Sequence, residues 1–186
     1  MKPIYLFMDE GSEEVESLGV IDIVRRAEIP IQIVSVTGSK MVTGSHGIKI
    51  EADLLLEDAD LDNAAMLVLP GGLPGTYNLN ENVAVRAAVL RHYEEGKLLA
   101  AICAAPIIFG QMGLLQGRKA TCYPGFDDQL EGATYTAALV ERDGQIITGK
   151  GPAAVFEFGY AIVEAMGAKE KADALRAGML YAELQK

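Results

Sequence analysis

Cys103 is the residue of this sequence best placed to act as a nucleophile. It follows the apolar run 98–102 and precedes small residues and Pro106, a pattern typical of a buried strand that turns directly into a helix. A cysteine at such a turn lies near a helix N-terminus, where the helix dipole and free backbone N–H groups favour a thiolate. Free cysteine is also a common core residue, so this pattern alone leaves both a nucleophile and a core filler open.

The acidic segment 9–16, Asp-Glu-Gly-Ser-Glu-Glu-Val-Glu, is a second candidate for chemistry. In its simplest interpretation Ser12 caps a helix and the acidic side chains complement the helix dipole. That accounts for Glu13 and Glu14, but less well for Glu16, which can face inward. A buried Glu16 carboxyl would have a raised pKa and, while protonated, could donate a hydrogen bond to a cysteine thiolate or its oxidised form.

Pro70-Gly71-Gly72 closes another apolar run, 66–69. Glycines expose their backbone N–H groups without side-chain obstruction. Next to a nucleophile such groups can form an oxyanion hole. A plain turn at the end of a strand is the alternative for so short a motif.

The remaining cysteine and the two histidines suggest no further site. Cys122 is best explained as a structural residue. His92 lies among charged residues of a predicted helix and His46 lies on a turn, so we expect both to be at the surface. Neither histidine forms a local pair with Cys103, which leaves a protease-type dyad without support. The cysteines and histidines also lack zinc-ligand spacing, and we expect no metal and no cofactor.

Length and charge narrow the class of protein. A chain of 186 residues suggests one domain, 1–186, with a substantial core. With 26 acidic and 16 basic residues the net charge is −10, and no basic cluster is available for nucleic-acid phosphates. Two cysteines make no disulfide framework, and we expect no signal peptide and no membrane span. The prediction is a cytoplasmic protein.

Apolar runs alternate with helical periodicities along the chain, which favours an α/β fold with a parallel sheet and helices on both faces. Ligands bind such sheets beyond the carboxyl ends of the strands. We expect the loops 9–16, 70–75 and 103–106 to meet there. The predicted strands are 4–8, 31–36, 66–69 and 98–102. One hairpin is predicted over 41–50, and a second pairs 134–140 with 145–148. The predicted helices are 13–26, 82–95, 106–115, 156–166 and 168–184.

These motifs together resemble the ThiJ/PfpI superfamily, most closely the branch of the parkinsonism-associated protein deglycase and its bacterial relatives. The resemblance covers essentially the whole chain. It is carried by the acidic segment 9–16, Val68-Leu-Pro-Gly-Gly72, Ala100-Ala-Ile-Cys-Ala-Ala-Pro106 and Gly151-Pro152 followed by Phe156-Glu157-Phe158. Asp22 and Arg25-Arg26-Ala27 also fit.

The resemblance implies a flavodoxin-like, class I glutamine amidotransferase-like three-layer sandwich with a mainly parallel sheet, usually in a homodimer. Cys103 would lie on a strained elbow with Glu16 hydrogen-bonded to it. Gly71, Gly72 and the N–H of Ala104 would form the oxyanion and substrate pocket. Pro152 belongs to a matching segment and would lie near that pocket.

Two positions depart from the family pattern. Many relatives carry a histidine where this chain has Tyr123, before Pro124. Tyrosine titrates near ~10, so a mechanism that needs an imidazole there is in doubt. His46 falls near a position where relatives often have an arginine that reaches toward the partner's pocket.

Three functions follow from this pattern. The first is a cofactor-independent enzyme of the stress response, in which Cys103 attacks a small dicarbonyl or a glycated adduct and Glu16 acts as acid and base, giving glyoxalase or deglycase activity. The second is a redox chaperone that senses oxidation through Cys103 without turning over a small molecule. The third, weaker because the imidazole is missing, is an intracellular peptidase.

Overall fold

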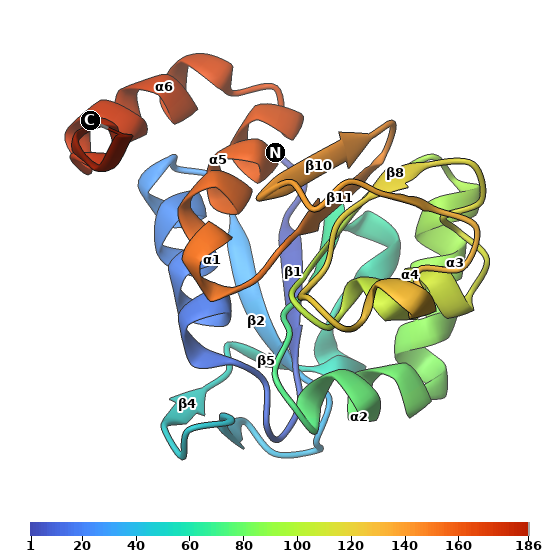
Figure 1. The fold of residues 1–186 in the computed structure, drawn as a ribbon. Coiled ribbons are helices and arrows are strands. Elements are labelled where there is room, and N and C mark those ends of the chain that lie inside the picture. Colours follow the sequence, from blue (N-terminus) through green and yellow to red (C-terminus); the bar gives the residue numbers. More distant parts are fainter. Residues whose placement is uncertain (186) are drawn as a thin grey trace.

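The computed structural model describes residues 1–185 and is built on one seven-stranded sheet (Figure 1). The strand order is β10-β11-β7-β6-β1-β2-β5, and every neighbouring pair is parallel except β10 with β11. The strands are β1 (Ile4–Met8), β2 (Ile31–Ser35), β5 (Leu54–Leu55), β6 (Met66–Leu69), β7 (Leu98–Ile102), β10 (Val140–Asp143) and β11 (Ile146–Gly149).

Helices cover both faces of the sheet and make three layers (Figure 1). One face packs against α1 (Glu14–Arg26) and α5 (Val155–Ala165), and α6 (Lys169–Gly178) lies against α5. The other face packs against α2 (Gly75–Glu81), α3 (Val83–Glu94) and α4 (Pro106–Gln111). The structure therefore confirms the flavodoxin-like α/β sandwich.

Strand β1 shows how the sequence builds the two cores. Ile4, Leu6 and Met8 belong to the core beneath α1 and α5. Tyr5 and Phe7 belong to the core beneath α3 and α4. Side chains alternate between the faces of a strand, and both faces are covered, so all of β1 is buried and its run is continuously apolar.

Shorter elements complete the chain. The predicted hairpin 41–50 forms as antiparallel β3 and β4, and β8 pairs with β9 in parallel. The remaining strands are β3 (Met41–Thr43), β4 (Lys49–Glu51), β8 (Lys119–Ala120) and β9 (Thr134–Tyr135), and the 3-10 turns are η1 (Leu56–Asp58), η2 (Leu61–Asn63), η3 (Asp127–Gln129), η4 (Pro152–Ala154) and η5 (Tyr181–Gln185).

Several element boundaries differ from the predictions. The helix expected over 106–115 ends at Gln111, just before Gly113, which has a φ of 73°. The helix expected over 168–184 ends at Gly178 and is followed by Leu180 with a φ of 59°. Within 134–140 only Val140 joins the hairpin with β11, because Thr134 and Tyr135 pair with β8 instead.

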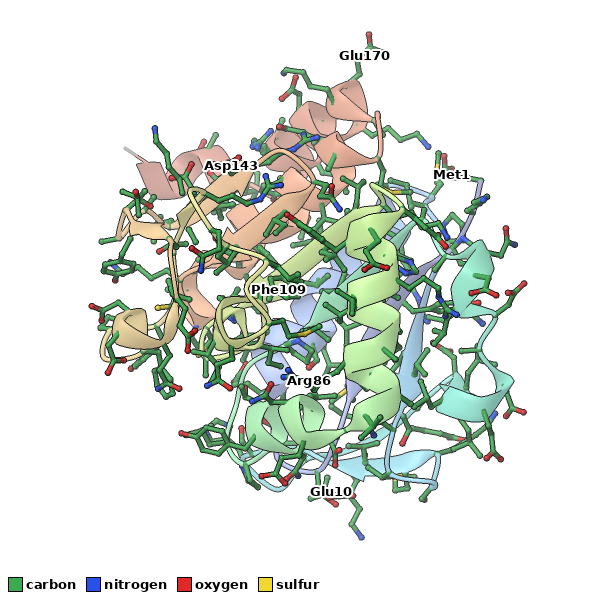
Figure 2. The ribbon with its side chains drawn as sticks, turned by 90° about the vertical axis from the view of Figure 1, so that its right-hand side faces the viewer. Met1, Glu10, Arg86, Phe109, Asp143 and Glu170 are labelled. Atoms are coloured by element: carbon green, nitrogen blue, oxygen red, sulfur yellow. The ribbon has the colours of Figure 1, made fainter. Side chains whose placement is uncertain are left out.

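The carboxyl ends of β1, β6, β7 and β11 share one edge of the sheet. Met1 precedes β1 and Glu10 follows it, and Figure 2 shows Glu10 at the bottom of the molecule and Met1 in its upper part. The loops that carry the candidate site therefore meet at the Glu10 end, as predicted. No helix among residues 1–185 is long and apolar enough to span a membrane.

Candidate active site

Cys103 sits on a tight elbow between β7 and α4, at a backbone φ of 64°. Left-handed backbone costs a non-glycine residue roughly 1–2 kcal/mol, and such strain concentrates at functional sites. Backbone bonds hold the elbow on both sides: the Cys103 N–H donates to Gly149 O at 2.9 Å, and the Tyr123 N–H donates to Cys103 O at 2.8 Å. The Cys103 side chain remains half-buried rather than sealed in the core.

Glu16 lies in the first turn of α1 and is completely buried. Its Oε2 accepts a hydrogen bond from the Gly71 N–H at 2.8 Å. Its Oε1 is buried without a hydrogen-bond partner among residues 1–185. The prediction that Glu16 faces inward is confirmed, and one carboxylate oxygen remains available for chemistry.

Gly71 brings the acid and the thiol together. A Cβ at position 71 would lie 2.5 Å from Cys103 Cβ and 2.7 Å from Glu16 Oε2, distances that no real side chain tolerates. The absent side chain therefore leaves the space in which Cys103 and Glu16 approach each other. Glycine is required at position 71 for close packing and not for its backbone conformation, because the left-handed φ of this turn (88°) belongs to Gly72.

Ionisation of the two groups is coupled. Burial raises the pKa of Glu16 to about 7, although the Gly71 N–H and the Cys103 thiol lower it. Burial also raises the pKa of the Cys103 thiol above its usual range, and the charge of Glu16 raises it further. The backbone N–H groups of Ala104 and Gly72 lower the pKa of the thiol, as expected of the elbow, but burial and the neighbouring carboxylate raise it by more.

The loop that carries Glu16 is fixed by Glu13 rather than by Ser12. Glu13 Oε2 accepts the Glu16 N–H at 2.7 Å as the helix cap, and the Glu13 N–H donates to Gly71 O at 2.9 Å. Ser12 Oγ instead accepts the Asp9 N–H at 3.1 Å. The predicted cap is thus one residue too early, and Glu13 ties the acidic loop to the glycine turn.

His46 joins the β3–β4 hairpin to the same loop. Its Nδ1 lies 2.8 Å from Glu14 Oε2 and 3.8 Å from Glu13 Oε1. Burial raises the pKa of Glu14, but hydrogen bonds from the His46 side chain and backbone lower it to about 2. These three side chains could hold a metal ion, but Glu14 already accepts several hydrogen bonds and we interpret the group as an anchor for the hairpin.

Tyr123 and Pro152 lie on the other side of the elbow. They line an apolar cavity of about 200 Å³ together with Leu139 and other residues of the segment 150–154. Tyr123 is half-exposed, and its ring lies directly against Gly151. Sequence reasoning placed Tyr123 and Pro152 near the pocket but missed Leu139 and Ala153, which carry no recognisable chemical motif.

The prediction for His92 is wrong. The side chain is fully buried, and neither ring nitrogen has a hydrogen-bond partner within the described part of the chain. Cys122 is buried in the core beneath α3 and α4, as expected of a structural cysteine. Neither residue belongs to the group around Cys103.

The elbow and the three-layer arrangement of one sheet between two layers of helices place the chain in a known class of flavodoxin-like α/β proteins. Residues 2–165 match the DJ-1/PfpI family, and the chain belongs to that family. The structure is similar to that of oxidized Toxoplasma gondii DJ-1, with a TM-score of 0.93 and 33% identity over 98% of this chain and 100% of that one.

Curated relatives agree with the structural comparison. The chain is 35% identical to the Parkinson disease protein 7 homolog of Danio rerio, over 96% of this chain and 97% of the relative. It is 40% identical to Protein DJ-1 homolog B of Arabidopsis thaliana, over 92% of this chain but only 40% of that protein. The chain thus spans less than half of the length of the Arabidopsis relatives. A relative named deglycase, from Pyrococcus abyssi, is 36% identical over 60% of this chain and 68% of its own length.

Proposed function

We propose that the chain is a cysteine-dependent enzyme that converts small 1,2-dicarbonyl compounds, or their adducts with protein amines, into hydroxy acids. The observation that best supports this activity is the buried Glu16 carboxyl, which lies beside Cys103 in the space left by Gly71. A carboxyl with a pKa of about 7 is suited to both accept and return protons at neutral pH. The name of the Pyrococcus relative supports the deglycase variant of this activity.

The first step forms a carbon–sulfur bond. Cys103 Sγ attacks the aldehyde carbon while Glu16 accepts the thiol proton, because burial and the charge of Glu16 raise the pKa of the thiol. The carbonyl oxygen becomes the oxyanion of a hemithioacetal. The backbone N–H groups of Gly72 and Ala104 face the sulfur and are the proposed donors to that oxyanion. The Gly71 N–H is already committed to Glu16 and serves to position the acid.

The second step moves hydrogen between adjacent carbons. Glu16 protonates the oxyanion, then removes the proton from the sulfur-bearing carbon and delivers it to the neighbouring carbon. The hydroxyl proton on the sulfur-bearing carbon passes in the same step to the oxygen of the neighbouring carbon. The former aldehyde carbon is thereby oxidised to a thioester and the former ketone carbon is reduced to an alcohol, so no external oxidant is required. Water then cleaves the thioester, which releases the hydroxy acid and restores the Cys103 thiol.

The test is lactate formation from methylglyoxal by the wild type, Cys103→Ser and Glu16→Gln. We expect no turnover in Cys103→Ser and a loss of about 10²–10⁴-fold in kcat in Glu16→Gln, the usual contribution of an acid–base group. Wild-type kcat/KM should rise with pH through about 7 as Glu16 becomes ionised. Equal rates in all three proteins would contradict the proposal.

Oxidation sensing is the second candidate, because the partnerless Glu16 Oε1 could hydrogen-bond to an oxidised sulfur. The structure of the Toxoplasma gondii relative is described as oxidized, which is consistent with oxidation sensing. The same three proteins distinguish the candidates. Absence of lactate together with a peroxide-driven mass gain confined to Cys103 would favour the sensor, and turnover at neutral pH would favour the enzyme.

A further inference from the structure

The apolar cavity beside the elbow is not used by the proposed chemistry. In the sheet, β7 lies between β6, which leads to Gly71, and β11, which leads to the segment 150–154. Cys103 follows β7, so the turn at Gly71 lies on one side of it and the segment 150–154, which lines the cavity, lies on the other. Cys103 is also bonded through its backbone to Gly149 and Tyr123, so the wall of the cavity and the nucleophile are fixed to each other.

We propose that this cavity is a subsite for a neutral apolar or aromatic substituent on the dicarbonyl substrate. The proposal rests on the proposed function, since the substituent is the group carried by the carbonyl next to the one that Cys103 attacks. The preferred substrates would then be aryl or branched α-oxoaldehydes, such as phenylglyoxal, rather than methylglyoxal.

Size and chemistry both fit such an occupant. A cavity of about 150 Å³ is enough to bind benzene, and this one has about 200 Å³. Leu139 and Ala153 offer apolar surface, and the half-exposed Tyr123 ring offers an aromatic face. Lys150 donates its Nζ to the backbone carbonyl of Ala137 at 3.0 Å. The rest of the lining is predominantly apolar, which favours a neutral substituent.

The kinetic test compares kcat/KM for phenylglyoxal with kcat/KM for methylglyoxal. Ala153→Phe fills the cavity and Leu139→Asp places a charge at its wall, and both residues are exposed, so neither change disturbs the core. Each variant should lower the phenylglyoxal-to-methylglyoxal ratio at least about tenfold, the usual discrimination of an apolar pocket. Ala87→Phe on α3, also exposed and far from the cavity lining, is the matched control and should leave the ratio unchanged.

A binding test separates the subsite from the reaction. Acetophenone, which carries the ring but no aldehyde, is titrated into the Cys103→Ser protein and into the same protein with Leu139→Asp. Saturable NMR shifts at the amides of Gly151 and Ala153 should appear in the first and be lost in the second.

The two measurements fail in different ways. If wild type turns over neither aldehyde but acetophenone shifts Gly151 and Ala153, the proposed reaction is wrong and the subsite stands. A kinetic ratio that stays within about twofold of wild type in both cavity variants, or acetophenone shifts that avoid this segment, would overturn the subsite.

Discussion

Folding takes the Glu16 carboxyl out of water and gives only one of its oxygens a hydrogen-bond partner within residues 1–185. Loss of hydration disfavours the charged form, which is why its pKa is raised to about 7. The property that suits Glu16 to proton transfer is thus the same property that makes it unfavourable for stability. This trade-off is confined to one side chain and can be measured there.

Glu16→Gln should stabilise the protein at alkaline pH. Between the ordinary pKa of 4.5 and about 7 the folded chain binds more protons than the unfolded chain, so the free energy of unfolding falls as pH rises. The full penalty of about 3 kcal/mol is present above pH 7 and absent below pH 4.5. Urea denaturation of both proteins at pH 4, 6 and 8 checks this.

The exposed Glu94→Gln, on α3, is the control for loss of a carboxylate and should not show this pH-dependent gain. A Glu16→Gln protein whose advantage over wild type is the same at pH 4 and pH 8 would show that Glu16 is ionised without cost.

Cys103 and Glu16 could be singled out as candidate site residues from the sequence, because an apolar run ending in cysteine and an acid beyond the capping positions each have a physical meaning there. Their ionisation was not, since the pKa of Cys103 depends on the burial of the elbow and on the charge of Glu16. The hydrogen bond from the Gly71 N–H to Glu16 could not be predicted from the sequence either, because the two residues are fifty-five positions apart.

At the scale of elements, α3 shows that helical spacing outweighs local charge. Its buried residues Val85, Ala88, Val89 and His92 follow the spacing of a single helix face. Charged neighbours suggested an exposed His92, but the periodicity of the apolar residues assigned it to the core. The burial of His92 could thus have been predicted from the sequence.

His92→Leu should stabilise the protein most at acid pH. Burial, together with the charge of Lys97, lowers the pKa of His92 to about 4. Between the ordinary 6.5 and about 4 the unfolded chain binds more protons, so wild type loses stability as pH falls through this window. The leucine variant lacks that loss, and its advantage should grow by about 3 kcal/mol between pH 7 and pH 4. Denaturant curves at four pH values would measure it, and a constant difference would contradict it.

Most long elements followed from periodicity, whereas the short ones did not. Strands β8 and β9 have two residues each, too few for an alternation to be seen. Helix α2 has no apolar stripe and forms where the glycine turn packs against the acidic loop, with a Cβ at Gly75 excluded by the backbone of Ser12. Such elements depend on tertiary contact rather than on local pattern.

At the scale of the whole molecule, apolar side chains remain exposed beside the site. Val15 and Leu18, which are 53% and 40% exposed, share one face of α1, and Ile48, 53% exposed, comes from the adjoining hairpin. Apolar side chains exposed close together favour an interaction site when they form one patch. We propose that this surface, Val15-Leu18-Ile48, contributes to the homodimer that the family resemblance implies.

Replacing Val15 and Leu18 together by aspartate should convert a dimer into a monomer of 19.9 kDa, because two charges would be buried in the contact. Sedimentation equilibrium of both proteins checks the mass. Val83→Asp, at an 80% exposed position on α3, is the control and should leave the dimer intact. A monomeric wild type, or a dimeric double variant, would contradict this assignment.

The left-handed backbone at Cys103 also has a consequence for directed evolution of this chain toward heat tolerance. Glycine adopts a φ of 64° without steric penalty, and an uncharged residue at position 16 avoids burying a carboxylate. A selection that scores heat resistance alone therefore favours replacement of Cys103 and Glu16, the proposed nucleophile and acid. Its survivors would keep the shape of the protein and lose its chemistry, so such a library has to be sorted on turnover as well as on temperature.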